Sequence, residues 1–109
     1  MLIIDGTELK GRHLVILDGD PIYLTHAVFM VLLRMAARKG WANKYDIESN
    51  GNAGRYLYRL KKESDGRIRI ENNGRDCYRI KNRTKLNLLA LFKLEDWEIK
   101  QLCRGGGDT

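Results

Sequence analysis

The sequence of 109 residues lacks the features that mark several classes of protein. It holds only two cysteines, Cys77 and Cys103, which lie far apart without a CxxC spacing, so we expect two reduced thiols in a cytoplasmic protein. Two widely separated histidines add no recognisable set of zinc ligands, and we expect no metal and no cofactor. No run approaches 18 apolar residues without a charge, which argues against a membrane span.

Catalytic patterns are missing as well. His13 and His26 each stand alone in the sequence, and a surface or capping role is expected for His26. Asp18, Asp20 and Asp46 are better explained by turns than as paired acids. Because there is no nucleophile–base pair and no phosphate-binding loop, we expect neither an enzyme nor a small-molecule substrate.

What the chain does have is an uneven distribution of charge. Its formal net charge is +6 at pH 7. Residues 52–85 hold eleven Lys and Arg against four acids, a net +7, whereas residues 1–51 hold six of each sign and residues 86–109 sum to −1. A positive field confined to one segment is typical of proteins that bind a polyanion.

The N-terminal quarter shows strand patterns. Residues 2–4 and 13–17 are short apolar runs, and Asp18-Gly19 follows the second of them. Asp-Gly between extended runs indicates a hairpin, because glycine readily takes the positive φ of a type I′ turn. We therefore predict a small antiparallel sheet over about residues 2–23.

Helical patterns follow over about residues 25–63. Thr25 is a suitable N-cap for a helix over 26–39, whose apolar residues recur at helical spacing and which Gly40 ends. Residues 41–51 allow one or two helical turns. A further helix is expected over 52–63.

The helix over residues 52–63 has two different sides. Its apolar side consists of Ala53, Leu57 and Leu60, and its basic side of Arg55, Arg59 and Lys62. One side is suited to a core and the other to a negatively charged partner.

Residues 67–81 are expected to form a basic hairpin. The apolar residues alternate in 67–71 and nearly so in 77–81. Keeping them on one face predicts that Ile68 faces Ile80, Ile70 faces Tyr78 and Arg69 faces Arg79. Like charges directly opposed destabilise a hairpin, so this register favours an anion against the outer face. The alternative is a solvated face with splayed side chains.

The C-terminal part is rich in leucine. Residues 86–104 are interpreted as a helical extension, most clearly helical from Glu95 to Cys103, and its apolar residues are too many for one helix face. Part of it is expected to cover the core and part to bury against a partner chain, which allows a homodimer through residues 86–103. The tail, 105–109, should be disordered.

Three strings follow one another along the chain: LVILDGDPIYLT, which runs into the helix capped by Thr25, LYRLKKE from Leu57 to Glu63, and IENNGRDCYRI from Ile70 to Ile80. In this order they resemble the winged-helix effector domain of OmpR-type bacterial response regulators. The resemblance covers roughly residues 13–80. The chain departs from the family pattern at Cys77, where the family has a wing glycine, and in the short stretch between the first and the recognition helix.

The resemblance implies an α+β fold. A winged helix-turn-helix domain would span residues 1–85, with a small N-terminal antiparallel sheet, three helices and a C-terminal hairpin wing. An extra C-terminal helix would follow this domain.

By the family's docking mode, the basic helix would enter the major groove and the wing would lie on a flanking backbone or minor groove. The candidate DNA-binding residues are Asn52, Arg55, Tyr58, Arg59, Lys62, Arg67, Arg69, Arg75 and Arg79. Arg55 and Arg59 would contact bases or backbone, Lys62 a phosphate, and Arg75 a narrow minor groove.

Three of these candidates have a second interpretation. Asn52 would either contact adenine or cap the helix. Tyr58 would either bind a phosphate or cover the domain edge. Arg79 would either contact DNA or brace the wing.

The leading hypothesis is a transcriptional regulator of a bacterium or phage that binds double-stranded DNA. A protein–protein assembly module without DNA binding is the alternative, because many winged helices serve as assembly domains and the C-terminal segment is leucine-rich. A third hypothesis is an RNA-binding domain. The scattered tyrosines favour it less, because single-strand readers stack bases on aromatics exposed on a sheet.

Overall fold

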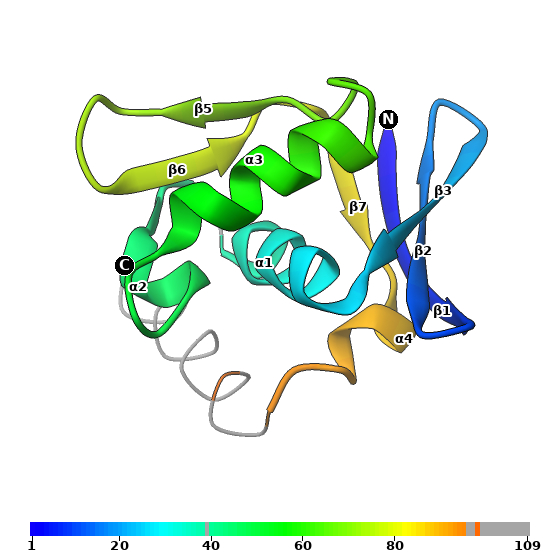
Figure 1. The fold of residues 1–109 in the computed structure, drawn as a ribbon. Coiled ribbons are helices and arrows are strands. Elements are labelled where there is room, and N and C mark those ends of the chain that lie inside the picture. Colours follow the sequence, from blue (N-terminus) through cyan, green and yellow to red (C-terminus); the bar gives the residue numbers. More distant parts are fainter. Residues whose placement is uncertain (39, 96–97, 99–109) are drawn as a thin grey trace.

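The computed structural model describes residues 1–38, 40–95 and 98. They form an α+β fold with seven strands and four helices (Figure 1). The strands are β1 (Leu2–Leu9), β2 (Arg12–Leu17), β3 (Asp20–Thr25), β4 (Ala42–Asn43), β5 (Ile70–Asn72), β6 (Cys77–Ile80) and β7 (Thr84–Leu86). The helices are α1 (His26–Ala37), α2 (Lys44–Ile47), α3 (Ala53–Glu63) and α4 (Leu88–Leu91).

The predicted N-terminal sheet is confirmed. β1, β2 and β3 pair in antiparallel order, and Asp18 and Gly19 turn between β2 and β3 with φ of 50° and 86°, as the Asp-Gly signal predicts. Alternate residues such as Ile4 and Val15 are buried on the inner face. β7 adds a fourth strand, parallel to β1, which the sequence did not reveal.

α1 lies at the centre of the molecule, between the N-terminal sheet and α3 (Figure 1). Its apolar residues cover so much of its circumference that seven of its twelve residues are buried. The helix ends at Ala37, earlier than predicted, because Arg38 takes an extended conformation with φ −91° and ψ 132°. Gly40 follows with a φ of 94°, a conformation that favours glycine.

Residues 41–51 contain the single helical turn α2, which confirms the prediction for this stretch. Asn43 caps it, because its Oδ1 accepts a hydrogen bond of 3.0 Å from the Tyr45 N–H. The Asp46 carboxylate accepts in return from the Asn43 N–H at 3.2 Å. This reciprocal pair stabilises a turn too short to form alone.

The second sheet has the order β4-β6-β5, and its β5–β6 hairpin is the predicted basic one. The predicted register is wrong. Ile70 pairs with Ile80, Glu71 with Arg79 and Asn72 with Tyr78, a shift of two residues. A shift of two keeps the apolar residues on the same face, so the alternation alone did not distinguish the registers. Arg69 does not face Arg79, and the repulsion argument for an anion on this pair therefore fails.

The C-terminal segment only partly matches the predicted helical extension over residues 86–104. Leu86 belongs to strand β7, and the helix α4 is a single turn, Leu88–Leu91. α4 packs closely on β1: a Cβ added to Gly6 would lie 2.8 Å from the Ala90 Cα. Most of the helix predicted from residue 95 to 103, and the tail, 105–109, lie outside the described residues.

Candidate nucleic-acid interface

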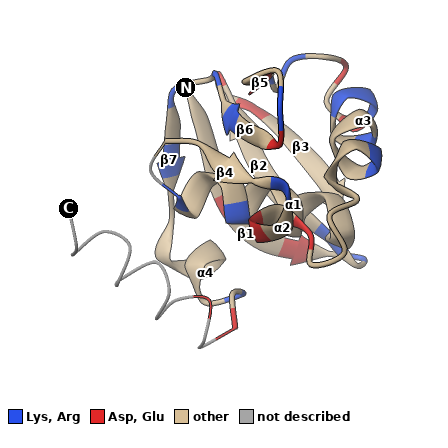
Figure 2. Cartoon of the chain, turned by 90° about the vertical axis from the view of Figure 1, so that its left-hand side faces the viewer, with Lys and Arg blue, Asp and Glu red and all other residues tan. Residues whose placement is uncertain are grey.

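The outward face of α3 is the most exposed cationic helix surface in the described part of the chain. Ala53 and Leu60 are buried against the core, which fixes the rotation of the helix, and α1 lies behind it. Arg55 and Lys62 are exposed to solvent, and Figure 2 shows that blue Lys and Arg segments recur along α3. The helical spacing of the sequence thus correctly predicts which side is buried.

Tyr58 lies on this exposed face and does not cover the domain edge. Its side chain is 60% exposed, and the Lys62 Nζ lies 5.0 Å from the centre of its ring. A cation over a tyrosine ring is attracted by the negative face of the ring. The pair therefore offers a phenol hydroxyl and an ammonium group side by side.

Asn52 occupies the N-cap position of α3, but its side chain makes no capping hydrogen bond. Its own N–H donates to the Asn50 Oδ1 at 2.8 Å, so Asn50 organises the turn before the helix. The prediction that the Asn52 side chain caps the helix is wrong. The side chain is exposed at the start of the cationic face.

Arg59 has polar partners within the protein that the sequence did not predict. Its guanidinium donates to the Thr25 Oγ1 at 3.2 Å and lies 3.8 Å from the Glu63 carboxylate. Glu63 also accepts from the Thr25 N–H at 2.8 Å and from its hydroxyl at 2.9 Å. Thr25 does stand at the N-cap position of α1, but its side chain is used here instead of for a cap bond. The three residues tie α3 to the start of α1.

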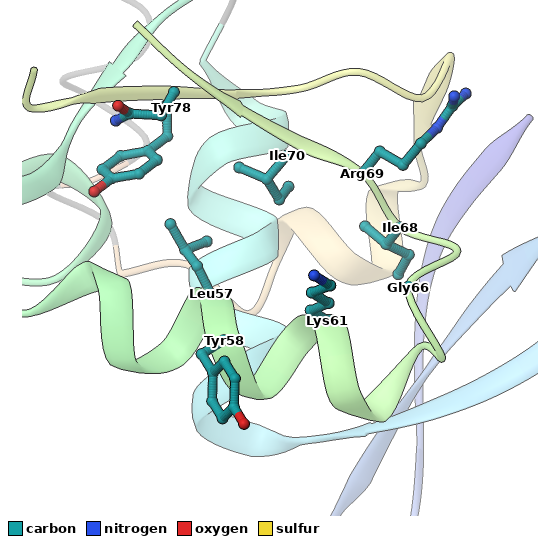
Figure 3. A pocket seen from close by; sticks show the side chains of 9 residues that line it. Leu57, Tyr58, Lys61, Gly66, Ile68, Arg69, Ile70 and Tyr78 are labelled. Atoms are coloured by element: carbon teal, nitrogen blue, oxygen red, sulfur yellow. The ribbon is translucent and has the colours of Figure 1, made fainter. Parts of the chain in front are cut away.

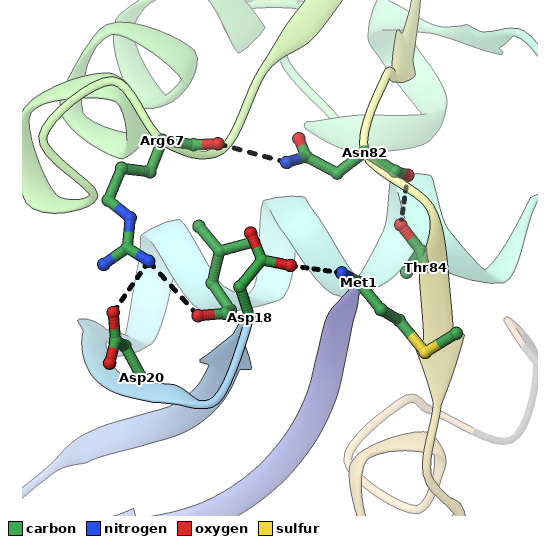
Figure 4. Close-up of polar contacts among 7 residues, drawn as sticks. Met1, Asp18, Asp20, Arg67, Asn82 and Thr84 are labelled. Atoms are coloured by element: carbon green, nitrogen blue, oxygen red, sulfur yellow. Dashed lines mark hydrogen bonds and ion pairs between the residues drawn. The ribbon is translucent and has the colours of Figure 1, made fainter.

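Arg67 is a structural brace (Figure 4). Its guanidinium donates to the Asp20 carboxylate at 2.9 Å and to the Leu17 carbonyl at 3.2 Å, which links the segment before β5 to the β2–β3 turn. Its own carbonyl accepts from the Asn82 side chain at 3.1 Å. A guanidinium with these partners has little freedom left for DNA.

Arg79 also has the bracing role that was one of its two interpretations. Its Nε donates to the Glu71 carboxylate at 3.0 Å, directly across the hairpin. The guanidinium carbon lies 4.4 Å from the centre of the Trp41 ring. This contact fixes β6 against the loop before β4.

Arg69 and Arg75 are both exposed, and neither forms an ion pair within the described residues. Arg75 stands at the tip of the hairpin, where its N–H donates to the Asn73 Oδ1 at 2.8 Å. The Gly74 N–H donates to the Asn72 Oδ1 at 2.8 Å, and Gly74 has a φ of 82°. Two successive Asn side chains therefore shape a tight tip that presents Arg75 outward.

The nine predicted residues thus fall into two groups. The bracing group consists of Arg59, Arg67 and Arg79. Arg67 and Arg79 are exposed as well, so what sets the second group apart is that its members are exposed and form no ion pair within the described residues; this exposed group consists of Asn52, Arg55, Tyr58, Lys62, Arg69 and Arg75. Lys61, exposed on α3 and not among the predicted residues, adds a further cation. Its place beside Lys62 in the basic helix was the signal that would have included it.

The two histidines do not stand alone. The His13 Nε2 lies 2.9 Å from the His26 Nδ1, and the His13 ring stacks on Phe29 with centres 4.7 Å apart. Burial is the main cause that lowers the pKa of His13, and the nearby Lys93 and the neighbouring His26 ring lower it further. In the described residues, no group of three His, Cys, Asp or Glu side chains comes together as a metal site.

Comparison of the chain with protein-family models, with curated proteins and with solved structures finds no match in any of the three. None of the helices in the described ranges has the length and apolar character needed to cross a membrane. The features of this chain that bear on function are therefore its fold and the placement of its charge.

Proposed function

We propose that this protein binds double-stranded DNA as a winged helix and acts as a transcriptional regulator. The order α1, β4, α2, α3, β5, β6 supports the proposal, together with the pairing of β4 to β6, because a winged helix is built in this order with a short strand completing the wing sheet. In this arrangement α3 is the recognition helix and β5–β6 is the wing.

The observation that carries the proposal is the exposed face of α3. Arg55, Tyr58 and Lys62 stand on a helix held against the core by its opposite side. An α-helix with its side chains is about 10–12 Å in diameter, which fits the major groove of about 12 Å in width. Arg55, near the N-terminal end of the helix, is placed to read bases, whereas Lys62 is placed to contact a phosphate.

The wing contributes fewer contacts than the sequence suggested. Arg67 and Arg79 hold the hairpin in place, so the proposed wing contacts are Arg69 and Arg75. Five cations of the proposed interface have no ion-pair partner among the residues that the structure describes: Arg55, Lys61, Lys62, Arg69 and Arg75. Each phosphate they neutralise contributes about −0.9 to the slope of log K against log salt concentration, so full use of all five gives about −4.5.

The test is a fluorescence anisotropy titration of a labelled random-sequence duplex over a range of salt concentrations. We expect binding at low ionic strength with a slope of several units. The same titration with labelled polyglutamate is the control for simple charge attraction, and it should give weaker binding. No duplex binding at low salt would overturn the proposal.

A second candidate function, a protein–protein assembly module, is favoured by one observation. Leu88 and Phe92 of the α4 region are 71% and 75% exposed, and Leu89 is exposed beside them. Exposed apolar side chains that cluster in one place are typical of protein interfaces. Light scattering of the wild type and of Leu88→Ser/Phe92→Ser tests it: a dimer or larger assembly that becomes monomeric in the variant supports a role in assembly.

A further inference from the structure

A groove with a volume of 380 Å³ lies between α3 and the strand β5 (Figure 3). Its apolar lining comes from two elements that the sequence places apart: Leu57 from α3, and Ile68 and Ile70 from the segment leading into and through β5. Tyr78 of β6 lies at one end. The groove is within the size range of small-ligand sites, which are mostly apolar with a few placed polar groups.

The charge along this groove has one sign. Lys61 and Arg69 line it, and none of the described carboxylates does. Figure 3 shows Lys61 extending from α3 toward β5, while Arg69 stands at the rim. Within the described residues neither cation has an ion-pair partner. An ammonium group beside an apolar surface, with no internal counter-ion, is complementary to a molecule that is apolar at one end and anionic at the other.

An aromatic side chain at the groove indicates which class of small molecule it suits. Tyr78 lies at one end of the groove, and Tyr58 also lines it, but Figure 3 shows the Tyr58 ring on the side of α3 that faces away from β5, so Tyr78 supplies the ring that a ligand would meet. Ring systems stack or meet edge to face with such side chains more favourably than flexible chains do. The apolar side chains of Leu57, Ile68 and Ile70 provide the surface on which a flat body would rest.

We propose that this groove binds a small aromatic molecule that carries one acidic group. The ring system lies against Leu57 and Ile70, and the carboxylate or sulfonate meets the Lys61 ammonium. A neutral molecule of the same shape gains the apolar contacts but not the charge-assisted hydrogen bond, and therefore binds more weakly.

The groove shares residues with the proposed DNA-binding surface. Tyr58, Lys61 and Arg69 belong to both. This part of the inference rests on the proposed function: a bound anion neutralises cations that DNA needs and occupies the space between helix and wing. Ligand and DNA then exclude one another, and the molecule acts as an effector that releases the protein from DNA.

The ligand site is tested without DNA, with anilinonaphthalene sulfonate as the probe and N-phenylnaphthylamine, which has the same rings without the sulfonate, as the neutral control. We expect saturable binding of the sulfonate by fluorescence. Lys61→Met, which keeps an unbranched side chain one atom shorter and removes the charge, should weaken binding of the sulfonate roughly tenfold and leave binding of the neutral dye unchanged. Lys81→Met is the matched control, because Lys81 is an exposed cation outside the groove.

Equal sulfonate affinity in wild type and Lys61→Met would overturn the site. Amide chemical shifts provide a second, independent measurement. They should move in residues 57–61 and 66–72 when the sulfonate is added. Changes centred instead on α4, where Leu88 and Phe92 are exposed, would place the dye on a different surface and also overturn the site.

The coupling to DNA is measured afterwards. With the sulfonate at ten times its own Kd, exclusion raises the apparent Kd for duplex DNA about tenfold. An unchanged DNA affinity would overturn the coupling and leave the ligand site standing. A protein that binds the dye in the groove but never binds DNA would overturn the proposed function alone.

Discussion

The helices α1 and α3 are almost equal in length, with twelve and eleven residues, yet they differ in nearly every other respect. α1 buries seven residues and α3 only two, Ala53 and Leu60. Their cations differ in the same way. Arg34 of α1 donates to the Ile47 carbonyl and to Glu98, each at 3.0 Å, whereas Arg55 and Lys62 of α3 project into solvent. One helix is buried in the core of the fold, and the other leaves a cationic side exposed to solvent.

The same division runs through the wing. Arg67 and Arg79 hold carboxylates and fix the hairpin, while Arg69 and Arg75 are left exposed. The number of positive charges therefore overestimates the number of cations available to a ligand, because some of these cations form ion pairs that hold the fold together. The comparison between bracing and exposed residues leads to the following predictions.

The largest effect is expected in α1. Phe29→Ala removes a fully buried ring that packs on His13, and the cavity it leaves should lower the free energy of unfolding by about 3–5 kcal/mol. Tyr58→Ala on α3, the matched aromatic truncation on an exposed surface, should change it by less than about 0.5 kcal/mol. Urea denaturation measures both. Equal costs would mean that α3 is as much a core helix as α1.

The next effect concerns binding. Arg55→Glu should weaken duplex DNA binding by about 1–3 kcal/mol without changing stability, because it reverses a charge that has no internal partner in the described residues. Arg34→Gln on α1 is the counterpart: it breaks the pair with Glu98 and should lower stability while leaving DNA affinity unchanged. Anisotropy and denaturation on both variants check this. If Arg34→Gln kept a native fold but lost DNA binding, the proposed division between a structural helix α1 and a DNA-binding helix α3 would be wrong.

A smaller effect is expected with pH. The pKa of His13 is lowered in the folded protein, so the unfolded chain binds more protons once the pH falls below the ordinary histidine value of about 6.5. Stability should therefore fall as the pH is lowered from about 7 to 5. The sites facing His13 are His26 and Lys93, which also lower its pKa, and Glu8, which raises it.

Replacement of the ring separates this contribution from the others. His13→Phe keeps an aromatic ring against Phe29 and removes the proton-binding site. It should flatten the dependence of unfolding free energy on pH over that range. An unchanged slope would show that other groups cause the dependence.

The smallest effect is expected from Glu71→Gln. The Glu71–Arg79 pair is partly exposed, so its loss should cost at most about 1 kcal/mol. It also frees Arg79 and removes a negative charge from the wing. The salt slope of DNA binding should therefore steepen by up to about 0.9, which a titration of the variant measures. A shallower slope would contradict the bracing role of this pair.

Patterns that depend on neighbouring residues could be predicted from the sequence. The Asp18-Gly19 turn and the buried side of α3 follow from local geometry and helical spacing. The wing register did not, because alternation fixes which face a residue occupies and leaves shifts of two open. The Asn72 and Asn73 side chains, which bond to the turn's backbone, determine the loop instead.

Partners distant in sequence could not be predicted in the same way. Thr25 meets Glu63 and Arg67 meets Asp20 only because α3 and the wing pack against the N-terminal elements. The strand β7 consists of only three residues, too few for a recognisable alternation. These contacts decide which of the predicted cations form an ion pair within the described residues.

The central claim is that DNA binding depends on where the positive charge lies and not on how much there is. It is tested most directly by comparing Arg55→Gln/Lys62→Gln with Lys10→Gln/Lys85→Gln. Both double variants lose two positive charges; Lys85 lies on β7, on the opposite side of Figure 2 from α3, and Lys10 lies in the β1–β2 turn.

The account predicts that the α3 pair lowers duplex affinity and makes the salt slope shallower by about 1.8, whereas the control pair leaves both close to wild type. Equal losses in the two double variants would contradict it.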